Sequence, residues 1–110
     1  MADKPQGIDR LNIKSEPQYA HFMSLHGELD LSNAEAVRAE FARIEATSVS
    51  RIVLDLSELE FIDSTGLAVI LGAHERARND GYVLRVLRPH GQVARVFELC
   101  GLDEVLAYGN

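Results

Sequence analysis

The residues best suited to chemistry lie together in one short loop, Asp63, Ser64, Thr65 and Gly66. The loop offers a carboxylate and two hydroxyls directly before an apolar run, so a hydroxyl there could act as a nucleophile or accept a phosphate. The same residue types suit the start of a helix, where Asp63 or Ser64 would accept hydrogen bonds from unpaired backbone N–H groups, a cap worth about 1 kcal/mol. The loop is therefore either a cap alone or a cap that also carries a functional hydroxyl.

A hydrolytic role for Ser64 finds little support elsewhere in the sequence. In the nucleophile elbow of hydrolases, glycines stand two residues before and two residues after the serine, and here Ile62 occupies the first of these positions. The serine would also need a general base, and His74 would lie about 15 Å away along the same helix at a rise of ~1.5 Å per residue. Three other histidines stay open as candidates: His21, His26 and His90. We expect no catalytic residue.

Metal, nucleotide and acid–base sites lack their usual patterns. Cys100 is the only cysteine and the histidines are scattered, so no zinc-ligand spacing occurs. No Walker lysine follows a glycine-rich loop, and no G-x-G-x-x-G motif follows a strand. Four acids could pair for acid–base work, although strand ends and turns are their commoner place: Asp30, Asp55, Glu60 and Asp63. We expect no cofactor, no metal and no enzymatic activity.

The charge balance points away from nucleic acid. Seventeen acidic residues against eleven basic ones give a formal net charge of −6, and the basic residues are dispersed, whereas nucleic-acid affinity needs clustered cations. Residues 1–10 lack the apolar run of a signal peptide. The longest apolar run, 67–71, falls far short of the roughly 20 residues that span a bilayer. We expect a cytoplasmic protein without direct nucleic-acid or membrane contact.

Apolar periodicity predicts strands at 8–16, 19–27, 51–56 and 82–87. The third is apolar enough to be central and buried on both faces, and it should run parallel to the fourth because a helix joins them. Segment 57–61 is typical of a turn, and 103–110 is compatible with a short helix or a strand.

Three amphipathic helices are also predicted. The first, 31–46, begins with a capping box of Ser32 and Glu35. The second follows Ser64 and ends at Gly81, and the third opens at Pro89 and stops at a left-handed Gly101. Their apolar stripes are Ala34, Val37, Phe41 and Ile44; Leu67, Ile70, Leu71, His74 and Ala77; and Val93, Val96, Phe97 and Cys100. We expect Cys100 in the core and His74 partly buried.

Together these elements predict a flexible arm at residues 1–7 and a single small α/β domain at 8–110. Its mixed β-sheet of four to five strands would have the amphipathic helices packed on it.

The glycines of the second helix suggest that its start is more than a cap. Thr65 adds a hydroxyl that capping does not need. Gly66 in the first turn and Gly72 in the middle are each disfavoured by about 1 kcal/mol relative to alanine. Small residues in such places indicate a close approach to the backbone, for which a partner protein or the active site of a kinase would be a reason.

Three segments resemble the signature regions of the STAS domain, in particular the bacterial anti-sigma factor antagonists. They are GELDLSNAEAVRAEF (27–41), RIVLDLSELEFIDSTGLAVILGAHERAR (51–78) and PHGQVARVFELCGLDEVL (89–106). The resemblance covers roughly residues 8–110. Its specific motifs are G-E-L-D before the first helix and D-S-T-G-L after a strand.

The resemblance implies a switch between partners. Antagonists of this family bind an anti-sigma factor that is also a serine kinase and so free a sigma factor; the kinase phosphorylates the loop serine, and a serine phosphatase resets it. Here the phosphoacceptor would be Ser64, with Thr65 as second choice, and Asp30 matches a position beside the loop that takes part in the kinase contact. The implied partner surface is Asp30, Asp63, Ser64, Thr65, Gly66 and Leu67. The alternative is a non-switching STAS subunit of a transporter or larger signalling assembly, in which Ser64 is only a cap.

Overall fold

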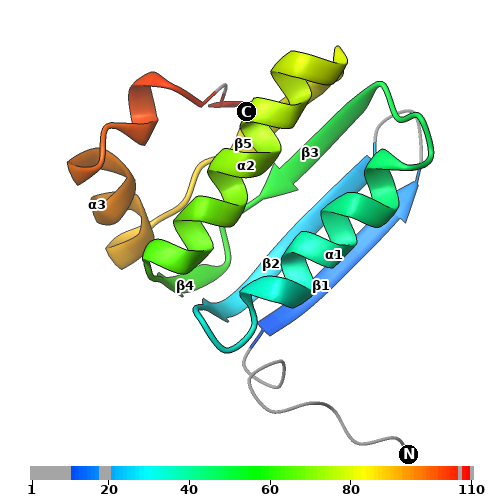
Figure 1. Ribbon diagram of the computed structural model, residues 1–110. Coiled ribbons are helices and arrows are strands. Elements are labelled where there is room, and N and C mark those ends of the chain that lie inside the picture. The colour runs from blue at the N-terminus through cyan, green and yellow to red at the C-terminus, as the bar shows by residue number, and fades with distance from the viewer. Residues whose placement is uncertain (1–10, 18–20, 107, 110) are drawn as a thin grey trace, which may run out of the picture.

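The computed structural model describes residues 11–17, 21–106 and 108–109 of the 110-residue chain. In chain order the elements are β1 (Leu11–Pro17), β2 (His21–Leu29), α1 (Ala34–Glu45), β3 (Arg51–Asp55), β4 (Leu59–Ile62), α2 (Ser64–Asp80), β5 (Val83–Leu87), α3 (Gly91–Leu99), the 3-10 turn η2 (Leu102–Glu104) and β6 (Tyr108–Gly109). Helices α1 and α2 lie side by side over the sheet, and α3 lies beside β4 (Figure 1). The predicted α/β class is confirmed. The arm expected at residues 1–7, and the start of the strand expected from residue 8, lie outside the described residues.

One long strand organises the sheet. The strand order is β1-β2-β3-β5-β6, with β4 paired to β2. β1 is antiparallel to β2, and the other pairs are parallel, so the sheet is mixed as predicted. The nine-residue β2 pairs through His21–Ser24 with β3 and through Gly27–Leu29 with β4. As a result, the carboxyl ends of β2 and β4 lie next to each other.

The expectation of a turn at 57–61 is wrong, because Leu59–Ile62 forms β4. A shift of register in the β2–β4 pairing leaves Glu60 and Phe61 both exposed between two buried residues. Such a bulge removes the alternation of two by which strands are found in a sequence. With β4, and with β6 in the undecided segment 103–110, the described part of the chain forms a sheet of six strands where four to five were expected.

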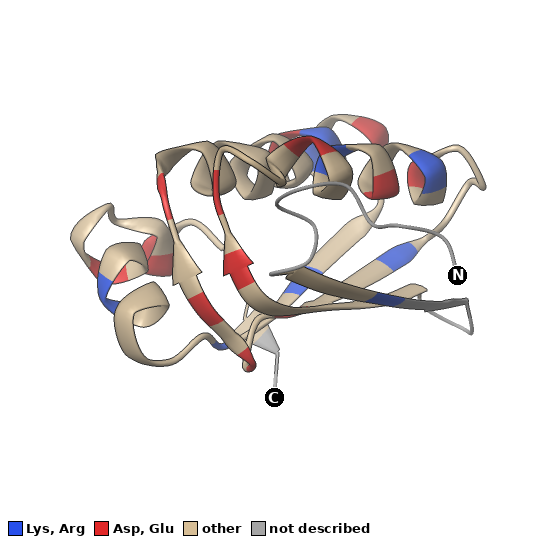
Figure 2. Cartoon of the chain, turned by 90° about the horizontal axis from the view of Figure 1, so that it is seen from below, with Lys and Arg blue, Asp and Glu red and all other residues tan. Residues whose placement is uncertain are grey.

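β3 lies in the middle of the sheet, as predicted, but only one of its faces is fully buried. Ile52 and Leu54 are completely covered, while Val53 and Asp55 on the opposite face are half-buried. Figure 2 shows the reason: α1 and α2 form one layer, and the sheet forms the other. The expectation of burial on both faces is therefore wrong. A β-branched residue such as Val53 suits a strand whether or not its face is covered.

The apolar stripe of α1 is confirmed, but the predicted capping box is wrong. The N-cap of α1 is Asn33, and its side chain makes no capping hydrogen bond. Asn33 is buried, its Oδ1 accepts from the Asp30 N–H at 2.9 Å, and its Nδ2 donates to the Glu28 carbonyl at 2.7 Å. Ser32 donates to Asp30 instead. Asn33 thus shapes the turn between β2 and α1.

Helices α2 and α3 end at left-handed glycines, Gly81 with φ 83° and Gly101 with φ 74°, as predicted. Helix α3 begins at Gly91, two residues after Pro89. Most of the predicted stripes are buried, with Leu71, His74 and Val96 only partly so. Cys100 is exposed, which contradicts the expected core position. It follows the last helical residue, Leu99, so the helical spacing no longer directs it inward.

Candidate functional site

Asp63 holds the loop before α2 with both of its carboxylate oxygens. Oδ1 accepts from the Gly66 N–H at 3.0 Å and so caps the helix. Oδ2 accepts from the Leu31 N–H at 3.0 Å, and the Asp63 N–H donates to the Leu29 carbonyl at 3.2 Å. Of the two cap candidates, Asp63 is therefore the cap. The same carboxylate fastens the turn after β2 to the start of α2.

Ser64 is the first residue of α2 and is exposed, and Thr65 beside it is half-buried. Because Asp63 caps the N-terminus of α2, the Ser64 hydroxyl is not required as a cap. A negative group on this hydroxyl would lie at a helix N-terminus, which favours an anion by about 0.3–1 kcal/mol. No hydrogen bond joins Ser64 to a histidine within the described residues, and His26 Nε2 lies 2.9 Å from the Ser24 hydroxyl instead. The site is therefore suited to receiving a phosphate.

Gly66 is needed for packing inside the domain. A Cβ at this position would lie 2.7 Å from Leu29 Cγ and 2.8 Å from Ile62 Cγ1. Both side chains are fully buried and cannot withdraw. A Cβ at Gly72 would meet only the end of the Arg76 guanidinium, at 3.2 Å. The close approach expected at Gly66 is thus real, but it comes from β2 and β4.

We therefore expect Gly66→Ala and Gly72→Ala to have opposite effects on stability. Overpacking at Gly66 should outweigh the gain in helix propensity and lower the free energy of unfolding by about 1–2 kcal/mol. Gly72→Ala should raise it by up to about 1 kcal/mol. Urea unfolding followed by circular dichroism measures both. Equal effects of the two substitutions would contradict the packing role of Gly66.

Asp30 lies next to this loop, as the resemblance implied. Its Oδ1 accepts from the Ser32 N–H at 3.0 Å and from the Ser32 hydroxyl at 2.5 Å. The neighbouring Leu31 is the residue whose N–H binds Asp63. The G-E-L-D and D-S-T-G motifs, more than thirty residues apart in sequence, are thereby brought together.

Two apolar side chains complete the surface beside Ser64. Asp30, Asp63, Leu31, Phe61 and Ser32 line a shallow hollow of about 370 Å³. Leu31 is 76% exposed and Phe61 is 39% exposed. Neither was predicted as a site residue, because only the meeting of the β2–α1 turn with the end of β4 makes them neighbours. An exposed apolar pair next to a charged rim is typical of a protein-binding surface.

Gly66 and Leu67, which the sequence analysis placed in the partner surface, lie under it. Gly66 is buried and Leu67 is 8% exposed, so their side-chain positions face the core. They support the loop and offer no side chain to a partner.

Acidic residues gather at the ends of β2 and β4 (Figure 2). They are Glu28, Asp30, Glu58, Glu60 and Asp63. The surface is therefore negative as well as partly apolar.

The described residues contain no cluster of three or more His, Cys, Asp or Glu arranged to hold a metal ion. No helix within the described ranges combines the length and the apolar character needed to cross a membrane.

Known proteins are similar to this chain in both sequence and fold. The model of the STAS domain family matches residues 12–109. The anti-sigma F factor antagonist of Paenibacillus polymyxa is 34% identical over an alignment of 100 residues that covers 87% of this chain and 86% of that protein. The crystal structure of an anti-sigma factor antagonist from Mycobacterium paratuberculosis matches with a TM-score of 0.81 at 26% identity, covering 91% of this chain and 86% of that one. The Bacillus cell fate determinant SpoIIAA in its phosphorylated form has the same fold, with a TM-score of 0.68 at 24% identity over 91% of each chain.

Proposed function

Because the chain belongs to the STAS domain family, as an anti-sigma factor antagonist, we propose that phosphorylation of Ser64 controls its binding to an anti-sigma factor. The unphosphorylated protein binds an anti-sigma factor that has serine kinase activity, and a sigma factor is freed. The kinase modifies Ser64 and ends the complex, and a serine phosphatase restores the hydroxyl. The chain itself catalyses no step, and it acts in the cytoplasm with its partner.

The observation that carries this proposal is that Asp63 caps α2 while the Ser64 hydroxyl is left exposed. Asp63 makes both the helix cap and the bond to Leu31, while Ser64 is exposed at the helix start. A hydroxyl that the fold does not use can be modified without unfolding the domain. The phosphorylated SpoIIAA, which keeps this fold, agrees with that view.

We assign the partner contact to the surface around Ser64 and Thr65. The exposed Leu31 and Phe61 would provide the apolar centre, and Asp30 would lie at the rim. The alternative of a non-switching subunit is not favoured, because the relatives that match over most of their length are antagonists.

The modification is tested by intact-mass analysis after incubation with a candidate anti-sigma kinase and ATP. We expect one phosphate on the wild-type chain, located on Ser64 by peptide fragmentation. Ser64→Ala should remain unmodified, and Thr65→Val should still carry its phosphate on Ser64. A phosphate elsewhere, or one that persists in Ser64→Ala, would contradict the proposal.

A further inference from the structure

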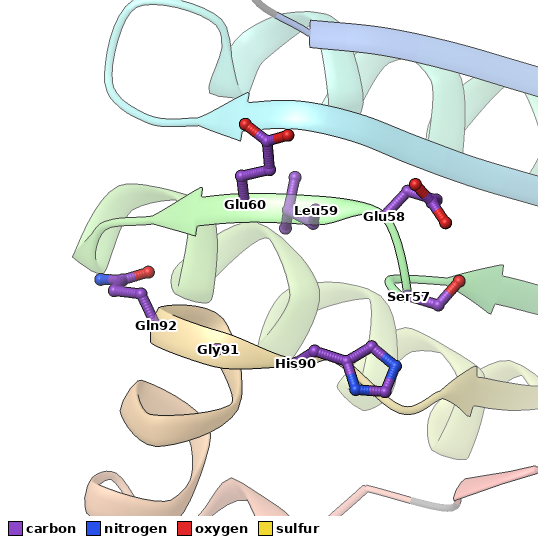
Figure 3. A pocket seen from close by; sticks show the side chains of 7 residues that line it. All are labelled: Ser57, Glu58, Leu59, Glu60, His90, Gly91 and Gln92. Atoms are coloured by element: carbon purple, nitrogen blue, oxygen red, sulfur yellow. The ribbon is translucent and has the colours of Figure 1, made fainter.

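Gln92 joins α3 to the strand that leads to Ser64. Its Oε1 accepts from the Ile62 N–H at 3.1 Å, and its Nε2 donates to the Ile62 carbonyl at 3.3 Å. An antiparallel neighbouring strand makes this exchange of two hydrogen bonds with a single residue. The side-chain amide therefore acts as a one-residue strand on the outer edge of β4. Figure 3 shows Gln92 on the first turn of α3, beside the end of β4.

Among the described residues, no strand pairs with the outer edge of β4. β4 pairs along its inner edge with β2. On the outer side, a hollow of about 320 Å³ lies between β4 and the start of α3 (Figure 3). It is lined by residues 57–60 on one side and by residues 90–92 on the other. Ile62 is 1% exposed, so its backbone groups need hydrogen-bond partners. Gln92 supplies them.

Gln92 is itself an exposed residue. An exposed position in the first turn of a helix tolerates most polar side chains, and the core does not require an amide there. What the amide does uniquely is to hold one particular backbone position. That position immediately precedes Asp63, the cap of α2, and lies two residues before Ser64.

The start of α2 is thus fixed from two sides. On the β2 side, the Asp63 N–H donates to the Leu29 carbonyl and Asp63 Oδ2 accepts from Leu31. On the α3 side, Gln92 holds Ile62. Phosphoryl transfer depends almost entirely on positioning, and a displacement of about 1 Å can lower a rate about a hundredfold.

We propose that Gln92 is a positioning residue for the phosphorylation of Ser64. Its amide fixes Ile62 and, through Ile62, the place at which the Ser64 hydroxyl is presented to the kinase. This inference rests on the proposed function of Ser64. It adds that α3, which is distant from the motif in sequence, takes part in setting the rate of modification.

The test compares steady-state phosphorylation of wild type, Gln92→Ala, Gln92→Glu and Arg95→Ala by the kinase that modifies the wild type. For Gln92→Ala we expect kcat to fall about tenfold or more, with KM changed less than about twofold, because positioning and not contact is lost. Gln92→Glu keeps the acceptor for the Ile62 N–H but loses the donor, so its kcat should lie in between. Arg95→Ala, an exposed change one turn along α3, should behave like wild type. Thermal melts establish that each variant is folded at the assay temperature.

The possible results distinguish the role of Gln92 from the proposed phosphorylation of Ser64. If the wild type is modified on Ser64 and folded Gln92→Ala has an unchanged kcat, only the role of Gln92 is overturned. A rise in KM alone, or an equal loss in Arg95→Ala, would indicate a direct kinase contact on α3 and would also overturn it. If no candidate kinase modifies Ser64 of the wild type, the proposed function fails and this inference fails with it.

Discussion

A phosphate on Ser64 should weaken binding to the anti-sigma factor by about 30-fold to several thousandfold, since an unpaired charge buried in an interface costs about 2–5 kcal/mol and each 1.4 kcal/mol is tenfold in affinity. The phosphate adds about −1.5 to −2 charges at pH 7. The charged residues that line the hollow next to the loop, Asp30 and Asp63, are both acidic and offer the phosphate no cationic partner. Isothermal titration of the anti-sigma factor with phosphorylated and unphosphorylated protein measures the difference.

Substitutions separate the charge from the hydroxyl. Ser64→Ala should bind like the wild type, because Asp63 and not Ser64 caps α2. Ser64→Asp should bind more weakly, though less so than the phosphorylated chain, because it carries a single charge. Ser50→Asp is the matched control, since Ser50 is exposed just before β3 begins, at the opposite end of the strands. Equal binding by Ser64→Ala and Ser64→Asp would refute the switch.

Asp63→Asn should lower the free energy of unfolding by about 2 kcal/mol, from a weakened cap and a lost hydrogen bond to a charged group. Both Asp63 oxygens accept from backbone N–H groups, those of Gly66 and Leu31. An asparagine has one acceptor oxygen, so its NH₂ group must face a second donor. The turn at Leu31 should loosen as well, which predicts weaker binding of the anti-sigma factor. Urea unfolding and titration measure the two effects.

Asp80→Asn is the control for Asp63→Asn. Asp80 is exposed at the last turn of the same helix, where the helix dipole disfavours a carboxylate. Its replacement should leave stability unchanged or slightly raised. Equal losses from the two substitutions would show that the two hydrogen bonds of Asp63 are not responsible.

The sequence predicted best those elements whose burial follows a regular period. The four stripe residues of α1 are all buried, because a straight amphipathic helix on one sheet face has a single periodicity. β4 was not predicted, because a bulge exposes Glu60 and Phe61 in succession and so removes the alternation of buried and exposed residues. The predicted capping box at Ser32 and Glu35 was wrong because Asn33 is the N-cap. The Asn33 side chain forms hydrogen bonds with the backbone of Asp30 and Glu28, which no local sequence pattern predicts.

The same distinction holds for the site. Asp63, Ser64 and Asp30 belong to continuous motifs and could be named from the sequence, although their roles as partner contacts stay a prediction. Phe61 and Gln92 could not, because their significance depends on which segments meet at the end of β4. Register between distant strands and the placement of α3 decide that meeting, and neither is encoded in local spacing.

The exposed Cys100 makes this protein convenient to label. It is the only cysteine of the chain and lies just beyond α3, whose opposite end carries Gln92. A maleimide fluorophore attached there would follow α3 while Ser64 is modified, without any engineered thiol. The same accessibility means that dissolved oxygen should oxidise the Cys100 thiols of two copies to an intermolecular disulfide during storage, so purification buffers need a reducing agent.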